Sequence, residues 1–255
     1  MKKNSWFWLS IFLIQCLCCA TGFSQANQED VLLANSVKWK IQQKKGLFGL
    51  SKPVFGDYTT LDIAKLDSGW MTKKIKDSSS LSFETSGHEG SDWDQSKFLT
   101  IKKNRVFKLR LASKTDTTKA IFSIASESKE KRQTFLGKIL SKNDAGKNVD
   151  LSFHRDIPGI IITGDKEIQW QLFIGNFSGN YISSGYLKNE KDSFNMKTYS
   201  SFNADLVLVN GEGAYLAALK FQEKPFYTWI RNDLTPFCRN AIAALFAVMI
   251  GIKDF

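Results

Sequence analysis

The chain has 255 residues, 43% of them hydrophobic, which is enough for one large domain with a sizeable core. Its formal net charge of +10 favours acidic partners, and anionic lipid headgroups, polyanionic glycans and nucleic acid all qualify on charge alone. Three of the four cysteines lie before residue 20, so removal of a leader would leave Cys238 alone and exclude an internal disulfide.

Residues 1–24 have the features of a secretory signal peptide. Two lysines and an apolar stretch, Trp6–Cys19, precede Gly22-Phe23-Ser24, which places small residues at the positions that a signal peptidase inspects. We therefore expect cleavage after Ser24 and a periplasmic, secreted or envelope-associated protein. A lipobox at Leu13–Cys16 and an uncleaved anchor remain as alternatives.

Residues 25–255 are expected to form a single β-rich domain. Short segments of alternating apolar and polar residues are bounded by turn-forming residues, as in all-β sandwiches and barrels. The clearest pattern puts Phe107, Leu109 and Leu111 on one face of a strand. Lys108 and Arg110 lie on the other face. The expected strands are Val37–Ile41, Thr59–Ile63, Arg105–Leu111, Ala120–Ile124, Thr134–Leu140, Val149–Phe153, Gly159–Thr163, Glu167–Ile174, Tyr181–Leu187, Phe194–Tyr199, Asp205–Val209, Ala214–Phe221 and Phe226–Arg231.

The segments between these strands are predicted from their polar and glycine-rich composition. Gln25–Asn35 is expected to be a loose lead-in and Asp77–Gln95 a long hairpin loop. Lys44–Gly46 and Pro53–Tyr58 are expected to be turns, and Lys129–Arg132 a basic turn.

The C-terminal segment, residues 236–254, has the pattern of a helix that is apolar on every side. Thr235 can cap it and Pro236 occupies its first position, while Ala241–Ile252 contains no polar residue. Such a helix must be enclosed, and an apolar run this short is more typical of a protein core than of a membrane span. A membrane tail is the alternative, with Ala243, Ala247 and Gly251 as a helix-pairing series.

Many strands followed by one apolar helix predict an all-β fold. We expect an antiparallel barrel, or a sandwich, of about twelve strands with the C-terminal hydrophobic helix in its core. Ala244, Ala247 and Gly251 lie on one side of that helix and would let strand backbones approach it closely.

Three segments, Ala214–Phe221, Trp229–Asp233 and Ile250–Asp254, together resemble the tubby-like superfamily, which includes the LURP-one-related proteins and the phospholipid scramblases. The resemblance covers about the last ninety residues and implies a barrel around a C-terminal hydrophobic helix. No headgroup-binding or calcium-binding motif of that superfamily is found in the sequence. No functional residue is therefore assigned from the resemblance.

No motif in the sequence points to a catalytic residue, a metal site or a cofactor. His154-Arg155-Asp156 is interpreted as a charged strand-end turn, because no nucleophile is placed near it by a recognisable motif. Asp92-Trp93-Asp94 lacks the spacing of a calcium loop. Cys238, at the start of the apolar helix, is interpreted as a small buried hydrophobic residue.

The excess of basic residues is the one remaining feature of the sequence that indicates a binding chemistry. On alternating strands such residues usually form a solvated face, but converging groups would create a surface for anions. The candidate ligand-binding residues are Lys38, Lys40, Lys73, Lys74, Lys102, Lys103, Arg105, Lys108 and Arg110.

The leading hypothesis is an exported, non-enzymatic β-barrel module that binds an anionic or amphipathic ligand at a membrane surface. Anionic lipid or a polyanionic glycan is the expected partner, with peripheral membrane association and no specific nucleic acid. One alternative is a glycan-active or other hydrolase on a β-sandwich, which would need Asp92 or Asp94 to face a distant carboxylate. Another alternative is a tail-anchored structural envelope protein.

Overall fold

The computed structural model describes nine segments of the chain. They are residues 28–45, 50–66, 71–76, 80–84, 92–133, 149–165, 167–177, 182–198 and 204–252. The expected signal peptide and the expected strand Thr134–Leu140 lie outside these segments.

The described segments form a short helix over residues 28–34, fifteen strands and a C-terminal helix. The strands are β1 (Ser36–Lys40), β2 (Gln42–Lys45), β3 (Ser51–Phe55), β4 (Tyr58–Lys65), β5 (Met71–Lys76), β6 (Ser80–Glu84), β7 (Asp92–Ala112), β8 (Thr117–Gln133), β9 (Val149–Thr163), β10 (Ile168–Gly175), β11 (Ser184–Lys188), β12 (Ser193–Thr198), β13 (Leu206–Val209), β14 (Tyr215–Lys220) and β15 (Tyr227–Arg231). The C-terminal helix is α3 (Pro236–Gly251).

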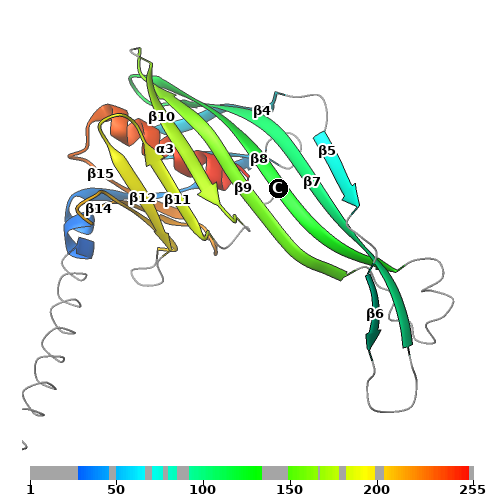
Figure 1. Ribbon diagram of the computed structural model, residues 1–255. Helices are drawn as coiled ribbons and strands as arrows, with labels where there is room; N and C mark the ends of the chain where they lie inside the picture. Colours follow the sequence, from blue (N-terminus) through cyan, green and yellow to red (C-terminus); the bar gives the residue numbers. More distant parts are fainter. Residues whose placement is uncertain are drawn as a thin grey trace, which may run out of the picture.

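The strands form one antiparallel sheet that curls into a nearly closed barrel (Figure 1). Its order is β1-β15-β14-β13-β12-β11-β10-β9-β8-β7-β4-β3-β2, and β5 and β6 pair with β7 outside this path. The all-β barrel with a C-terminal core helix that the sequence predicts is therefore confirmed.

The barrel closes within a single stretch of chain. β1 pairs with β15, whereas β2, which follows after Ile41, pairs with β3. The N–H of Ile41 still donates to the carbonyl of Phe226 at 2.9 Å, so the exchange of partners occurs at this residue. Beside it, Trp39 lies edge-on to Tyr58 and against Gly56, where a Cβ atom would come within 2.6 Å of the indole ring. The two ends of the sheet are thus sequence neighbours.

Three long strands, β7, β8 and β9, continue beyond the closed part of the barrel toward β5 and β6 (Figure 1). This extension corrects three predictions. Lys129–Arg132 is part of β8 and pairs with β7, so it is not a turn. The predicted loop Asp77–Gln95 contains β6 and the start of β7. Val149–Phe153 and Gly159–Thr163 are one strand, and His154 therefore lies within β9 rather than at a strand end.

The first strands also differ from the sequence prediction. Lys44 and Lys45 belong to β2, and Pro53–Phe55 belongs to β3, where only Gly56 and Asp57 form the turn into β4. Pro53 pairs with Gln43 of β2, and its carbonyl accepts a hydrogen bond from Thr60 Oγ1 at 2.7 Å.

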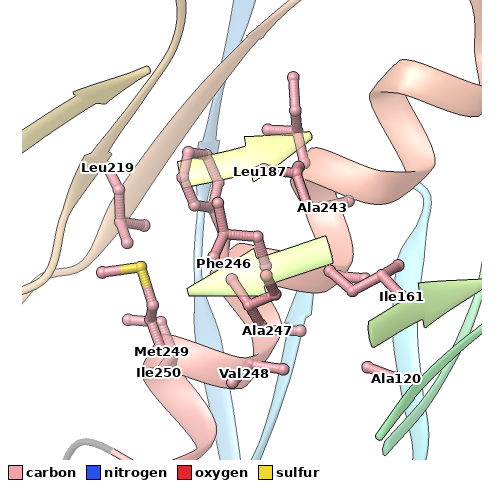
Figure 2. Close-up of a cluster of buried hydrophobic side chains, with 14 of the residues drawn as sticks. Ala120, Ile161, Leu187, Leu219, Ala243, Phe246, Ala247, Val248, Met249 and Ile250 are labelled. Atoms are coloured by element: carbon pink, nitrogen blue, oxygen red, sulfur yellow. The ribbon is translucent and has the colours of Figure 1, made fainter. Parts of the chain in front are cut away.

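Helix α3 lies inside the barrel and contacts β3, β4, β7, β8, β9, β10 and β15. Every residue from Ala241 to Ile250 is fully buried. Figure 2 shows its side chains, among them Phe246, Val248 and Met249, packed with residues of the surrounding strands such as Ile161 and Leu219. Because burial of a large apolar side chain contributes about 1.5–3 kcal/mol, this helix is a main source of stability.

Both ends of α3 are fixed by specific contacts. At its start, Thr235 Oγ1 accepts the N–H of Cys238 at 3.3 Å, as the cap prediction requires. At its end, Ser51 Oγ donates to the carbonyl of Ile250 at 3.0 Å. A Cβ atom on Gly251 would lie 3.2 Å from the Ser51 carbonyl, so the helix touches the β3 backbone here. The predicted close approach at this glycine is confirmed.

A second, smaller core lies on the outer face of β13, β14 and β15. Leu32, in the helix over residues 28–34, is fully buried there beside Val207, Ala218 and Trp229. All four residues of β13 are buried, because Leu206 and Leu208 on its other face belong to the main core of the barrel. The prediction of a loose lead-in is wrong for residues 28–34, since Leu32 anchors them to the barrel.

Among the described helices, none is long and apolar enough to cross a membrane.

We expect Leu245→Ala to lower the free energy of unfolding by about 2–5 kcal/mol, because Leu245 is fully enclosed in the barrel core. The matched control is Leu61→Ala, the same truncation at a β4 side chain that is 47% exposed, with an expected change below about 0.5 kcal/mol. Urea unfolding measures both. If Leu245→Ala does not fold, Ile250→Val offers a milder change of about 0.5–1.5 kcal/mol. Equal, small effects for buried and exposed truncations would contradict an enclosed helix.

Candidate functional site

The predicted basic residues divide into two sets in the structure. Lys38, Lys40, Lys108 and Arg110 are exposed on the outer surface of the barrel. Lys44 on β2, Lys52 on β3 and Lys119 on β8 also lie on this outer surface. Since β1 continues into β2 and the sheet order is β2-β3-β4-β7-β8, these side chains occupy one continuous sector. We call it the basic wall: Lys38, Lys40, Lys44, Lys52, Lys108, Arg110 and Lys119.

Cations face each other across neighbouring strands of the basic wall. In the strand register Lys44 is opposite Lys52, and Arg110 is opposite Lys119. A third pair, Lys73 opposite Lys102, extends the pattern to β5. Like charges directly opposite one another on a sheet are destabilising, so this arrangement is unfavourable for an isolated barrel.

Carboxylates offset only part of this charge. Asp62 Oδ2 lies 3.8 Å from Arg110, and it is the only acidic residue in strands β1 to β5. Glu127 bridges Lys102 at 2.9 Å in the extension, and Asp57 bridges Lys114 at 2.9 Å in the adjoining turns. The wall therefore keeps a net positive charge.

Exposed aliphatic side chains stand among the cations. Ile121 on β8 and Ile160 on β9 are paired in the strand register and are 46% and 45% exposed. Ile121 is also opposite Lys108. Leu61 on β4 is comparably exposed, and its carbonyl accepts a hydrogen bond from Lys52 Nζ at 3.1 Å. The wall thus presents both positive charge and apolar surface to a partner.

Aromatic rings border the wall at β15. Lys38 Nζ lies 4.2 Å from the ring centroid of Tyr227 and 5.2 Å from that of Trp229. These cation–π contacts fix the ammonium group at the surface.

The other predicted basic residues lie in the extension. Lys102 is exposed and bound to Glu127. Lys103 and Arg105 lie on the opposite face of β7 from Lys102. Further along the strand, the same face carries Phe107 and Leu109 in the barrel core. Lys73 and Lys74 pair with β7 at Lys102 and Ile101, and their side chains lie outside the described part of the chain. The structure therefore brings only some of the predicted residues together.

The barrel end at which α3 begins has the opposite charge. Successive connections in an antiparallel sheet alternate between its two ends, so every second connection lies at this end. Each of the six connections there carries a carboxylate. We call this end the acidic rim: Asp57, Asp116, Asp165, Glu167, Glu190, Asp192, Glu212 and Asp233. The charge of the molecule is thus separated between one end and one side of the barrel.

A buried polar link joins α3 to this rim. Tyr58 Oη donates to Asn240 Oδ1 at 3.3 Å, and Asn240 Nδ2 donates to Asp116 Oδ2 at 3.3 Å. Burial raises the pKa of Tyr58, although nearby Arg239 partly opposes this shift. These hydrogen bonds satisfy the side chains of Tyr58 and Asn240 inside the barrel mouth.

A cavity of about 670 Å³ opens at the same end of the barrel, between the β9–β10 turn, the β11–β12 turn and the first turn of α3. Sequence reasoning missed it because its walls come from three segments far apart in the chain. Its lining residues are Glu167, Ile168, Gln169, Trp170, Asn189, Glu190, Lys191, Asp192, Thr235, Phe237 and Cys238.

Cys238 lies on the inner wall of this cavity. It is buried as predicted, and its Sγ is 3.8 Å from Asp192 Oδ2. Burial is the main cause that raises the pKa of the Cys238 thiol, Thr235 partly lowers it, and the Asp192 carboxylate adds to the rise. The thiol is therefore neutral at physiological pH and contributes apolar surface.

Of the residues His154, Asp156, Asp92 and Asp94, only Asp156 has a described side chain. Asp156 Oδ1 accepts the N–H of Asn176 at 3.0 Å, which gives this residue a structural role in β9. The side chains of His154, Asp92 and Asp94 lie outside the described part of the chain. Within that part, no three His, Cys, Asp or Glu side chains are grouped to hold a metal ion.

No family model matches this sequence, and neither a curated protein nor a solved structure matches it.

We expect Lys119→Glu to raise the free energy of unfolding by about 0.2–1 kcal/mol, because it converts a pair of like charges with Arg110 into a pair of opposite charges. Lys197→Glu is the control, since Lys197 on β12 is exposed and faces Val207 in the register. Urea unfolding at low and high salt measures both variants. A loss of stability at low salt for Lys119→Glu, with a folded spectrum, would contradict repulsion within the wall.

The raised pKa of Cys238 predicts a loss of stability in alkali. The pKa of the Cys238 thiol is higher in the folded chain than in the unfolded chain, where it is about 8.5. The resulting contribution to stability is fully present at pH values below the unfolded pKa and is lost as the pH rises through the folded pKa. Relative to Cys238→Ala, the natural chain should therefore lose unfolding free energy from about pH 8.5 upward. Urea unfolding between about pH 7 and 9.5 measures the difference, below the range in which tyrosines titrate. If the difference in unfolding free energy between the natural chain and Cys238→Ala stayed constant over this pH range, the explanation by burial would be contradicted.

Proposed function

We propose that this chain is an exported, non-enzymatic β-barrel module that binds an anionic lipid surface through the basic wall. The observation that carries this proposal is the placement of cations opposite cations in the register, Lys44 with Lys52 and Arg110 with Lys119. An anionic partner would convert this unfavourable repulsion into attraction.

The strength of such binding follows from the number of cations. Each Lys or Arg near an anionic bilayer contributes about 1 kcal/mol, and the contribution falls off within a Debye length. Seven cations on a curved wall cannot all reach a flat surface at once. Contact by three or four of them would give a reversible, salt-sensitive interaction, as expected of a peripheral protein.

The aliphatic side chains favour a lipid surface over a glycan. Ile121 and Ile160 form an exposed pair beside Lys108, and Leu61 lies near Lys52. A bilayer interface accepts both charged and apolar side chains, whereas a sulfated or carboxylated glycan leaves apolar side chains in water.

The resemblance to the tubby-like superfamily adds to the proposal. A barrel around a C-terminal hydrophobic helix is the architecture that this resemblance implies, and relationship to that superfamily is part of what we propose. The site itself is argued from the residues of this chain alone.

The test is binding of the purified full chain to vesicles of neutral lipid and of neutral lipid mixed with anionic lipid. Arg110→Glu/Lys119→Glu should weaken binding to anionic vesicles at least about tenfold, because two attractive charges become repulsive. About 1 M salt, which shortens the Debye length to about 3 Å, should abolish the difference between the two vesicle types. Binding to neutral vesicles measures any contribution of the apolar N-terminal residues to membrane binding.

The matched control is Lys188→Glu/Lys197→Glu, the same reversals on β11 and β12, which should leave binding unchanged. Thermal unfolding of each variant checks that it is folded. Equal binding to neutral and anionic vesicles, or an equal loss in both double variants, would overturn the proposal. Binding to heparin without binding to anionic vesicles would instead identify a glycan as the partner.

A further inference from the structure

The cavity at the acidic rim has the dimensions of a small-molecule site. Its volume of about 670 Å³ lies within the range of about 300–1,000 Å³ that is typical of such sites. It lies at the mouth of the barrel, where β-barrels commonly bind ligands. It is separate from the basic wall, because none of the wall residues lines it.

The lining divides into an apolar part and a charged part. Ile168, Phe237 and the neutral thiol of Cys238 supply the apolar part, and the fully buried Trp170 lies behind them. Trp170 is held in place by its Nε1, which donates to Thr163 Oγ1 at 3.3 Å. The charged part consists of the carboxylates of Glu167, Glu190 and Asp192 and the ammonium of Lys191. A fitting ligand therefore has an apolar portion and a polar end.

The charges select the sign of that polar end. Three carboxylates and one lysine give the lining a negative sign, opposite to that of the whole chain. The start of α3 adds about half a positive charge, which offsets part of one carboxylate. Because the negative charge still prevails, the site favours a cation.

The β11–β12 turn fixes the central carboxylate, Asp192. Asn189 Oδ1 accepts the N–H groups of Lys191 at 2.8 Å and of Asp192 at 2.6 Å. Asn189 Nδ2 donates to Asp192 Oδ2 at 3.4 Å. This network sets the turn independently of any ligand, so the carboxylate is already in place at the cavity wall.

We propose that the cavity binds an amphipathic organic cation, a small molecule with an ammonium group and a short apolar chain. The ammonium group lies against Asp192 and Glu167, and the apolar chain packs on Phe237, Ile168 and Cys238. This site is independent of the proposed membrane-binding wall, so either proposal stands if the other fails.

The test uses three probes of equal length, octylammonium, octanol and octanoate, titrated into the full chain by calorimetry below their aggregation limits. Octylammonium should bind with one site per chain and at least about tenfold more tightly than octanoate, with octanol between them. Asp192→Asn and Glu167→Gln should each weaken octylammonium binding about threefold, since a single exposed charge pair contributes up to about 1 kcal/mol.

Glu212→Gln is the matched control, because Glu212 lies on the β13–β14 turn of the same rim but outside the cavity. It should leave octylammonium binding unchanged. Equal weakening by Glu212→Gln would mean that the electric field of the whole rim causes the effect, which would overturn the proposal. Tighter binding of octanoate than of octylammonium, or no binding of octylammonium, would also overturn it. Glu167 is exposed, so its variant keeps the test valid if Asp192→Asn proves unstable.

Discussion

Enclosure of α3 is the constraint on which the rest of the structure depends. A helix without a polar face cannot meet water, so the sheet must surround it. An eight-stranded barrel has an interior just wide enough for its own side chains, whereas a helix is about 10–12 Å across. The thirteen-strand path of this sheet provides the larger circumference. Because Gly251 has no side chain, the helix touches the β3 backbone directly.

Closure of the barrel joins the beginning of the chain to its end. β1 pairs with β15, and the next strand, β2, pairs with β3, so the exchange at Ile41 completes the ring. The strand that closes the barrel and the helix that fills it are about two hundred residues apart in sequence. Contacts of this separation are formed at a high entropic cost, which favours slow folding. The helix cannot be enclosed until the first strands are in place.

The sequence predicted the parts of the fold that have a periodic signal. Phe107, Leu109 and Leu111 alternate with cations and became a core face of β7, and the apolar run of α3 required enclosure. β2 was missed because it has no apolar residue, and β5 because half of its residues are lysines. The pairing that makes them strands is supplied by β3 and β7. The helix over residues 28–34 was missed because Leu32 alone anchors it, on a surface that exists only after β13–β15 have assembled.

The candidate sites were predictable to different degrees for the same reason. Lys108 and Arg110 could be assigned to one face from strand alternation alone, but their position beside Lys119 and Ile121 depends on the β7–β8 register. The cavity had no local signal at all. Trp170, Asp192 and Phe237 meet only because two turns and a helix start are brought to one end of the barrel.

The separation of charge relates the two proposed sites to each other. The basic wall runs along the side of the barrel, whereas the cavity opens at its end, so a membrane against the wall would lie alongside the barrel and leave the mouth facing water. A barrel bound in this way keeps its cavity accessible from solution, because the two surfaces have opposite charge and share no residue.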